Sequence, residues 1–198
     1  MIRFATKADV PQMLNIYAPY ILNTAYTFEY TVPTPEEFTQ RFVSYTKQCP
    51  WLVWEENGVV LGYAYGSLPF ERAAYSWCGE VSCYLAPEIQ GKGIGRKLYA
   101  VLEEIMWRQG YRVLYSLITS ENTGSLAFHE KVGYTTCANF PGCGLKFDRW
   151  LGVVWMEKRS EIVEIPRNFP TSWREVVDND GKASDILDDF PLSEMQKM

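Results

Sequence analysis

A glycine-rich turn lies between a strand-like run and a helical pattern, and its residues are Gln90-Gly91-Lys92-Gly93-Ile94-Gly95-Arg96. A loop that closes around an anion points successive backbone N–H groups inward, in dihedrals that glycine adopts without strain. A helix beginning there adds unpaired N-terminal amides and the positive end of its dipole. With Lys92, Arg96 and Lys97 nearby, the turn is predicted to bind a pyrophosphate. A flexible connection before a helix is the alternative for such a cluster taken alone.

Two common phosphate-binding motifs are excluded by spacing. A Walker A loop needs Ser or Thr after its Gly-Lys pair, but Gly93 follows Lys92. The Rossmann spacing fails because its third glycine would fall on Arg96 or Leu98, depending on the starting glycine. These spacings argue against a nucleotide triphosphatase.

The elements that position this turn are a strand before it and an amphipathic helix after it. The strand is expected around Gly79 to Leu85, and Pro87 then interrupts pairing. After the turn, apolar residues recur at helical spacing as far as Gly110, namely Leu98, Val101, Leu102, Ile105 and Met106. This is the strongest helical pattern in the chain.

Further elements alternate along the chain. Helices are predicted to start near Asp9 and at Thr34-Pro35, the second running to about Lys47. Strands over 51–54 and 59–65 flank Asn57-Gly58, a dipeptide suited to a tight hairpin turn. A strand over 111–119, a short helix over 125–132 stopped by Gly133, and further strand over 145–158 with a turn complete a mixed α/β pattern.

Composition indicates one globular domain with a tail. The chain has 198 residues, of which 47% are hydrophobic. Residues 161–198 carry nine acidic and four basic side chains, whereas residues 1–160 carry fifteen of each. A charge-balanced body argues against nucleic-acid binding. The boundary is placed at residue 160, and Pro166, Pro170 and Pro191 predict a partly irregular acidic extension over 161–198.

Cysteine usage and hydropathy bear on location. The five cysteines lack close Cys-x-x-Cys spacing, which predicts neither a disulfide framework nor a zinc site, so no metal is expected. The N-terminal segment does not resemble an export signal, and the apolar run 150–156 is too short to span a bilayer. A cytoplasmic protein without membrane contact is predicted.

The motifs together resemble those of the GNAT N-acetyltransferases, in particular the phosphinothricin and methionine sulfoximine acetyltransferase branch. The resemblance covers roughly residues 1–158. It rests on the glycine turn and on Ala74-Tyr75-x-Trp77, Glu80, Tyr84, Asn122-x-x-Ser125-x-x-x-His129-Glu130-x-x-Gly133-Tyr134 and Lys146-Phe147-x-Arg149-Trp150. It implies a central, mixed, mostly antiparallel twisted sheet with a splayed strand pair and flanking helices.

The resemblance also implies how acetyl-CoA, the co-substrate, is held. The turn from Gln90 through Gly91, Lys92, Gly93, Ile94 and Gly95 to Arg96 would grip its pyrophosphate. Backbone groups of Cys83, Tyr84 and Leu85 would pair with the pantetheine arm, so Cys83 need not be a nucleophile. Asn122 would hydrogen-bond the cofactor or hold its strand, and Ser125 is expected to cap the short helix.

Two residues are the implied catalytic candidates. Glu80 would remove a proton from the amine, directly or through water; the alternative is that it only orients the ammonium group or pairs with a base on another strand. His129, the single histidine, stands where many relatives have a tyrosine that protonates the departing thiolate. Imidazole can act as acid, base or hydrogen-bond donor, and a purely structural histidine is the alternative.

The acceptor is implied to be an amino-acid analogue acetylated directly on its α-amine, in a detoxification role. Arg72 would bind its carboxylate, unless it only pairs with Glu71 on the surface. Phe28, Tyr75 and Trp77 would form the apolar walls, unless these aromatic residues only belong to the core. A homodimer is carried over from the family. Peptide N-terminal acetylation, a non-catalytic acyl-CoA sensor, and an interaction protein using tail residues such as Trp173 and Phe190 are the alternative functions.

Overall fold

Seven strands of the described residues form one sheet with helices on both faces. The computed structural model describes residues 1–162 and 164–179. The strands are β1 (Ile2–Phe4), β2 (Trp51–Glu56), β3 (Val59–Ser67), β4 (Cys78–Leu85), β5 (Val113–Thr119), β6 (Thr135–Lys146) and β7 (Arg149–Arg159). The helices are α1 (Val10–Asn23), α2 (Pro35–Tyr45), α3 (Ile94–Gln109), α4 (Thr123–Lys131) and α5 (Trp173–Asn179), with short 3-10 turns at Lys7–Asp9, Ala73–Tyr75 and Pro87–Ile89.

The sheet is mostly antiparallel, with one parallel contact at its centre. Its order is β1-β2-β3-β4-β5-β7-β6, and only the β4/β5 pair is parallel. That pair covers three positions and ends at Glu80↔Tyr115, although the strands continue to Leu85 and Thr119. The implied mixed sheet with a splayed strand pair is therefore confirmed.

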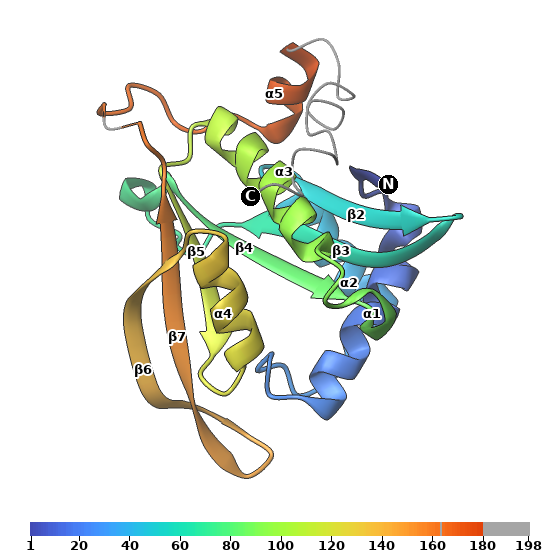
Figure 1. Cartoon of the computed structure of the whole chain (residues 1–198). Coiled ribbons are helices and arrows are strands. Elements are labelled where there is room, and N and C mark those ends of the chain that lie inside the picture. Colours follow the sequence, from blue (N-terminus) through green and yellow to red (C-terminus); the bar gives the residue numbers. More distant parts are fainter. Residues whose placement is uncertain (163, 180–198) are drawn as a thin grey trace.

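The two faces of the sheet are covered by different helices. Figure 1 shows α3 and α4 in front of the sheet and α1 and α2 behind it. On the α3 face, Gly66 and Gly79 leave room for Met106, because a Cβ added at either would lie within 3.0 Å of that side chain. On the α1 face, the ring of Tyr17 packs edge-on against Tyr84 at 4.6 Å. Side chains alternate across a strand, so β4 contributes to both layers.

Local signals explain several of these elements. Thr34 and Glu37 exchange both bonds of a capping box at the start of α2, as predicted. Asn57 and Gly58 have φ values of 52° and 80°, so the predicted hairpin turn between β2 and β3 is confirmed. Gly110, with φ of 104°, ends α3 in the left-handed region.

Strand β1 was not predicted from the sequence, and strand β6 is longer than predicted. The predicted strand began at 145, whereas β6 begins at Thr135 and is exposed at nearly every position. An exposed edge strand has no buried face and therefore no alternating pattern to detect. The strand has two register shifts, and the one between Phe140 and Gly144 contains Pro141 and lets the strand accommodate it.

A segment of the predicted tail packs against the body. Trp173 stacks on Phe4 with ring centroids 4.6 Å apart, and its indole N–H donates to the Thr46 carbonyl at 2.9 Å. Val176 and Val177 are buried. Helix α5 was not predicted, because proline and acidic residues dominate the segment around it. Phe190 and Pro191 lie outside the described residues, and the domain boundary at 160 stays a prediction.

Candidate active site

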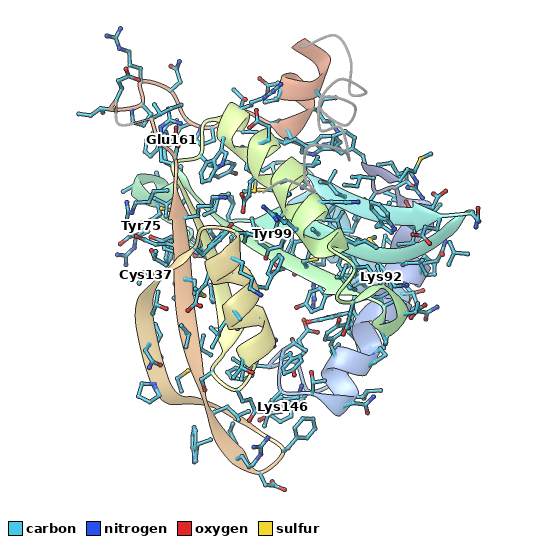
Figure 2. The ribbon with its side chains drawn as sticks, in the orientation of Figure 1. Tyr75, Lys92, Tyr99, Cys137, Lys146 and Glu161 are labelled. Atoms are coloured by element: carbon cyan, nitrogen blue, oxygen red, sulfur yellow. The ribbon has the colours of Figure 1, made fainter. Side chains whose placement is uncertain are left out.

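A cavity of about 680 Å³ lies where β4 and β5 separate, beside the glycine turn and the starts of α3 and α4. It brings together most of the residues predicted to hold acetyl-CoA. Those lining it are strand residues 83–85, turn residues Gln90, Gly91 and 93–96, and Asn122 before α4. His129, predicted as a catalytic residue, also lines it. Lys92 belongs to the turn but does not line the cavity; Figure 2 labels it at the exposed tip.

The backbone of the turn is open toward this cavity. Gly91 and Gly93 have φ values of 72° and 77°, and a Cβ added at either would meet no atom within 4 Å. Their requirement for glycine is therefore conformational rather than steric. The first helical bond of α3 runs from the Lys97 N–H to the Gly93 carbonyl at 3.2 Å. No backbone acceptor outside α3 is found for the N–H groups of 91–96 within the described part of the chain, so these amides are available to an anion.

The cationic side chains near the turn differ in their placement. Arg96 lines the cavity. The Lys97 ammonium instead lies 5.5 Å from the centre of the Trp54 ring on β2, where it makes a cation–π contact. Arg96 is therefore the cation best placed to accompany the turn amides.

Cys83 lines the cavity on β4, but its thiol is poorly suited to nucleophilic attack. Burial raises the pKa of the Cys83 thiol to about 12. The thiolate is the reactive form of cysteine, and it is scarce at neutral pH under these conditions. The predicted role of Cys83 through its backbone groups fits this chemistry.

His129 is buried on α4 and both ring nitrogens are engaged. Nδ1 lies 2.8 Å from the Ser125 carbonyl oxygen, and Nε2 lies 3.0 Å from the Tyr99 hydroxyl. A carbonyl oxygen only accepts, so Nδ1 carries a proton. Burial lowers the pKa of His129, which favours the neutral ring. Nε2 is then an acceptor, and Tyr99 donates to it.

Tyr99 was missed by sequence reasoning. It is fully buried, extends from α3 toward α4, and its hydroxyl lies 3.4 Å from Ser116 Oγ and 3.5 Å from the Val81 carbonyl. Burial raises the pKa of Tyr99 well above its usual value, so it remains a donor. The one available signal was its position next to the apolar stripe of α3, and that position is equally consistent with core packing.

The cap of α4 differs from the prediction. Asn122 Oδ1 accepts a hydrogen bond from the Ser125 N–H at 3.1 Å, so Asn122 is the N-cap. The prediction that Ser125 caps this helix is wrong, because the helix starts at Thr123, before Ser125. Asn122 thereby holds the segment between β5 and α4 at the cavity wall.

Glu80 stands at the point where the two strands part. It is the last β4 residue in register with β5, and its carboxylate has no hydrogen-bond or ion-pair partner among the described residues. Burial raises the pKa of the Glu80 carboxyl. Glu80 does not line the cavity, and its side chain lies on the face of β4 opposite to Val81 and Cys83. It therefore faces the layer that contains Tyr65 and Tyr84.

The four residues predicted to bind the acceptor are not gathered at one place. Trp77 stacks on Phe169 at 5.1 Å and donates to the Asn168 carbonyl at 3.1 Å, so it holds the C-terminal segment. Tyr75 is half-exposed and packs on Phe70 at 4.7 Å. Arg72 is exposed and forms no ion pair with Glu71 or another carboxylate of the described residues. None of these three side chains lines the cavity.

The fourth, Phe28, lies on the segment between α1 and α2, which is tied to the β6–β7 hairpin. The Phe28 ring covers Gly144, where an added Cβ would come within 2.1 Å of it. Beside it the buried Lys146 ammonium donates to the carbonyls of Ile21, Thr24 and Thr27 at 2.7–2.8 Å. Figure 2 shows Lys146 where the hairpin meets this segment. In the sequence, Lys146 stands out only as part of the motif Lys146-Phe147-x-Arg149-Trp150.

Two further findings concern metal ions and membranes. Among residues 1–162 and 164–179, no three His, Cys, Asp or Glu side chains gather as they would around a metal ion. Within the same ranges, no helix is both long enough and apolar enough to cross a membrane.

Comparison with known proteins identifies the family. Residues 2–155 match the acetyltransferase (GNAT) domain, so the chain belongs to this family of acetyl-CoA-dependent N-acetyltransferases. An L-methionine sulfoximine/L-methionine sulfone acetyltransferase of Salmonella typhimurium is 38% identical over 157 residues, covering 79% of this chain and 92% of that protein.

Solved structures agree with this assignment. A phosphinothricin acetyltransferase of Sinorhizobium meliloti in complex with AcCoA superimposes with a TM-score of 0.81 and 32% identity, covering 85% of this chain and 94% of its own. A ribosomal-protein-alanine N-acetyltransferase of Brucella melitensis gives 0.78 and 34%, covering 81% and 99%. The family resemblance drawn from the motifs is thereby confirmed.

Proposed function

We propose that this enzyme transfers acetyl from acetyl-CoA directly to the α-amino group of a small amino-acid-like acceptor of the phosphinothricin, methionine sulfoximine or methionine sulfone type. The observation that carries the proposal is the cavity itself. It joins an open anion-binding turn to an unpaired strand edge at the point where Glu80 stands. The named relatives support this class of acceptor.

The chain's groups fit acetyl-CoA in three ways. The free amides of 91–96 and the Arg96 guanidinium suit a pyrophosphate. The edge of β4 beyond Glu80 suits an extended arm that carries amides. When bound, acetyl-CoA supplies a thioester that is already activated toward attack by an amine.

Glu80 is the residue we assign to the acceptor amine. An ammonium group must lose a proton before its nitrogen can attack, and the unpartnered carboxylate of Glu80 accepts that proton directly or through one water. Burial brings the carboxyl pKa closer to neutral pH, which suits a general base. Glu80 faces the opposite side of the sheet from the cavity floor, so the amine would approach from the α1 face.

His129 and Tyr99 are assigned to the side where the thiolate departs. The neutral His129 ring has no proton on Nε2 to give in its resting state, because burial disfavours the imidazolium. The Tyr99 hydroxyl has one proton, which it donates to His129 Nε2 at rest; as the thiolate departs, that hydrogen bond would shift from Nε2 to the sulfur at the cavity wall. The pair then stabilises developing negative charge by hydrogen bonding rather than by a standing positive charge.

The test is acceptor-dependent thiol release. The protein is mixed with acetyl-CoA and a panel of amino-acid analogues, and free thiol is followed together with the mass of the acetylated product. Release that depends on the amine is the expected result. No acceptor-dependent release across a broad panel, combined with tight acetyl-CoA binding in calorimetry, would instead identify a non-catalytic acyl-CoA sensor.

Peptide N-terminal acetylation is a second candidate, favoured by the structural likeness to the Brucella protein. The discriminating measurement compares kcat/KM for methionine sulfone with that for a hexapeptide carrying a free N-terminus. The proposed function requires the single amino acid to be the better substrate. A preference for the peptide would support the second candidate.

We also propose a cytoplasmic homodimer. The five cysteines are all free, as expected in a reducing compartment. Exposed aromatic residues offer an apolar surface for a second copy, among them Phe140 and Trp150 on the outer strands and Tyr75 in the turn before β4. Sedimentation at micromolar concentration should give twice the chain mass of 22.8 kDa. A monomer would contradict this proposal without affecting the chemistry.

A further inference from the structure

The edge of β4 that faces the cavity is partly occupied by side chains of the protein. β4 pairs with β3 along its length, and the Ala86 N–H continues that pairing to the Leu61 carbonyl at 2.8 Å. Backbone groups of a strand point alternately to its two sides. The outward groups beyond Glu80 therefore belong to the odd-numbered residues Val81, Cys83 and Leu85.

Hydroxyl groups cover both ends of this edge. At one end the Val81 carbonyl accepts from Ser116 Oγ at 3.1 Å. At the other end the Tyr20 hydroxyl donates to the Leu85 carbonyl at 2.6 Å and accepts from the Leu85 N–H at 3.3 Å. Gln90 Nε2 donates to the same hydroxyl at 3.0 Å and to the Leu85 carbonyl at 3.2 Å, so it supports this cap. Cys83 lies between these caps, and no strand of the described residues pairs with its outward N–H and C=O groups.

We propose that Tyr20 and Ser116 set the register of the acyl-CoA arm, leaving Cys83 as the single peptide unit open to it. Tyr20 and Ser116 are positioning residues in this proposal, which rests on the proposed function. An extended arm with secondary amides pairs with a strand edge through its own C=O and N–H groups. A slip to the next outward residue would displace the thioester by about 7 Å, the length of two strand residues.

Two anchors of different kind then hold the co-substrate. The glycine turn holds the pyrophosphate, and the hydroxyl caps hold the arm. A thioester without the pyrophosphate, such as S-acetylpantetheine, depends on the caps alone. Removing a cap should therefore affect the truncated thioester more than acetyl-CoA.

The kinetic test uses Tyr20→Phe, which keeps the ring and frees the Leu85 N–H, while the Leu85 carbonyl loses its bond from Tyr20 and keeps the one from Gln90 Nε2. A second register then competes with the productive one. With S-acetylpantetheine, kcat and KM should fall together by about twofold or more, because half of the bound arm is misplaced when the registers are equally populated. The values for acetyl-CoA should change by less. Ser116→Ala opens the other end and should behave likewise, whereas Tyr45→Phe removes a tyrosine hydroxyl elsewhere and should change neither.

Amide hydrogen exchange reads the register without any acceptor or turnover. CoA should slow exchange at Cys83 in the wild-type protein, and at both Cys83 and Leu85 in Tyr20→Phe. The exchange result does not depend on whether any amine in the panel is acetylated. Failure of the register proposal and failure of the proposed function can therefore be distinguished. CoA that protects Leu85 equally in both proteins, or protects neither residue, would overturn the register proposal. Equal kinetic effects of Tyr20→Phe on both thioesters would overturn it as well.

Discussion

The Nε2 atom of His129 lies 3.0 Å from the hydroxyl of Tyr99, and the Nδ1 atom of the same ring lies 2.8 Å from the Ser125 carbonyl oxygen. These two contacts fix the tautomer, since the carbonyl requires a proton on Nδ1. The histidine predicted from the motif is therefore part of a buried pair. Its partner Tyr99 comes from the helix that starts in the glycine turn.

The first prediction concerns the ionisation of His129. Because it is the single histidine in the chain, its ring signal in a proton NMR titration belongs to it alone. The titration should give a pKa below the ordinary 6.5, as burial disfavours the charged ring. Tyr99→Phe removes a donor that stabilises the neutral ring and should raise that pKa. A pKa unmoved by Tyr99→Phe would contradict the assigned hydrogen bond.

The same burial predicts a dependence of stability on pH. Below about 6.5 the unfolded chain binds a proton at His129 that the folded protein resists, so the free energy of unfolding should fall as pH drops from 6.5 toward the lowered folded pKa. Urea unfolding at pH 7.0 and 5.5 measures this. His129→Gln should lose less stability over that interval than the wild-type protein does.

Replacement of His129 should affect turnover more than binding. In His129→Phe the Tyr99 hydroxyl loses its acceptor, and we expect kcat to fall by about 100-fold, the scale of general acid–base contributions. The Kd for acetyl-CoA should change by about twofold or less, because the turn and strand edge remain. Steady-state kinetics and calorimetry separate the two effects. Equal losses in both would assign His129 a structural role.

Replacement of Glu80 should change the pH profile. Glu80→Gln should lower kcat/KM by about 100-fold at pH 7 and by less above pH 8, where α-amines become neutral without a base. The variant should also be more stable at neutral pH, since it removes a buried carboxylate that has no partner. A profile parallel to that of the wild type would show that Glu80 does not take the proton.

The glycine turn has a matched control within the chain. Gly93 and Gly58 both have positive φ, and an added Cβ meets nothing within 4 Å at either site. Alanine at either position should cost about 1–2 kcal/mol of stability for the left-handed backbone. Only Gly93→Ala should also weaken acetyl-CoA binding, by about tenfold, because it tilts the amides that face the anion. Equal affinities of the two variants for acetyl-CoA would show that the turn does not bind the co-substrate.

Lys146 supports the segment that carries Phe28. Lys146→Met leaves three carbonyls without their charged donor and should cost about 1–3 kcal/mol in unfolding free energy. The KM for the acceptor should rise while the KM for acetyl-CoA stays nearly constant, because the cavity lies on other elements. A selective rise in the KM for acetyl-CoA would refute this placement.

Much of the cofactor side could be predicted from the sequence, because its signals are local. The glycine spacing, the strand before it and the stripe on α3 all lie within about thirty consecutive residues, and the structure brings Gly91, Gly93 and Arg96 to one cavity. Their function as ligands stays a prediction. The exposed strand β6 and helix α5 carried no comparable pattern.

The acceptor side was less predictable for a physical reason. Trp77 was assigned to the acceptor by motif, but its contacts are set by Asn168 and Phe169, about ninety residues away in the chain. Likewise, Tyr99 and Lys146 gain their significance from partners on other elements. Such long-range contacts leave no periodic trace in a single sequence.

Acetyl transfer to an α-amine is tested most directly by a pair of acceptors that differ only in that group. Methionine sulfone and its α-hydroxy counterpart are each incubated with the protein and acetyl-CoA, and thiol release is measured together with product mass. The proposed function predicts one free thiol for each N-acetylated methionine sulfone and no release above background with the hydroxy acid. Equal thiol release with both acceptors would contradict the proposed function. So would the absence of release with both, if the other amines of the panel are also inactive.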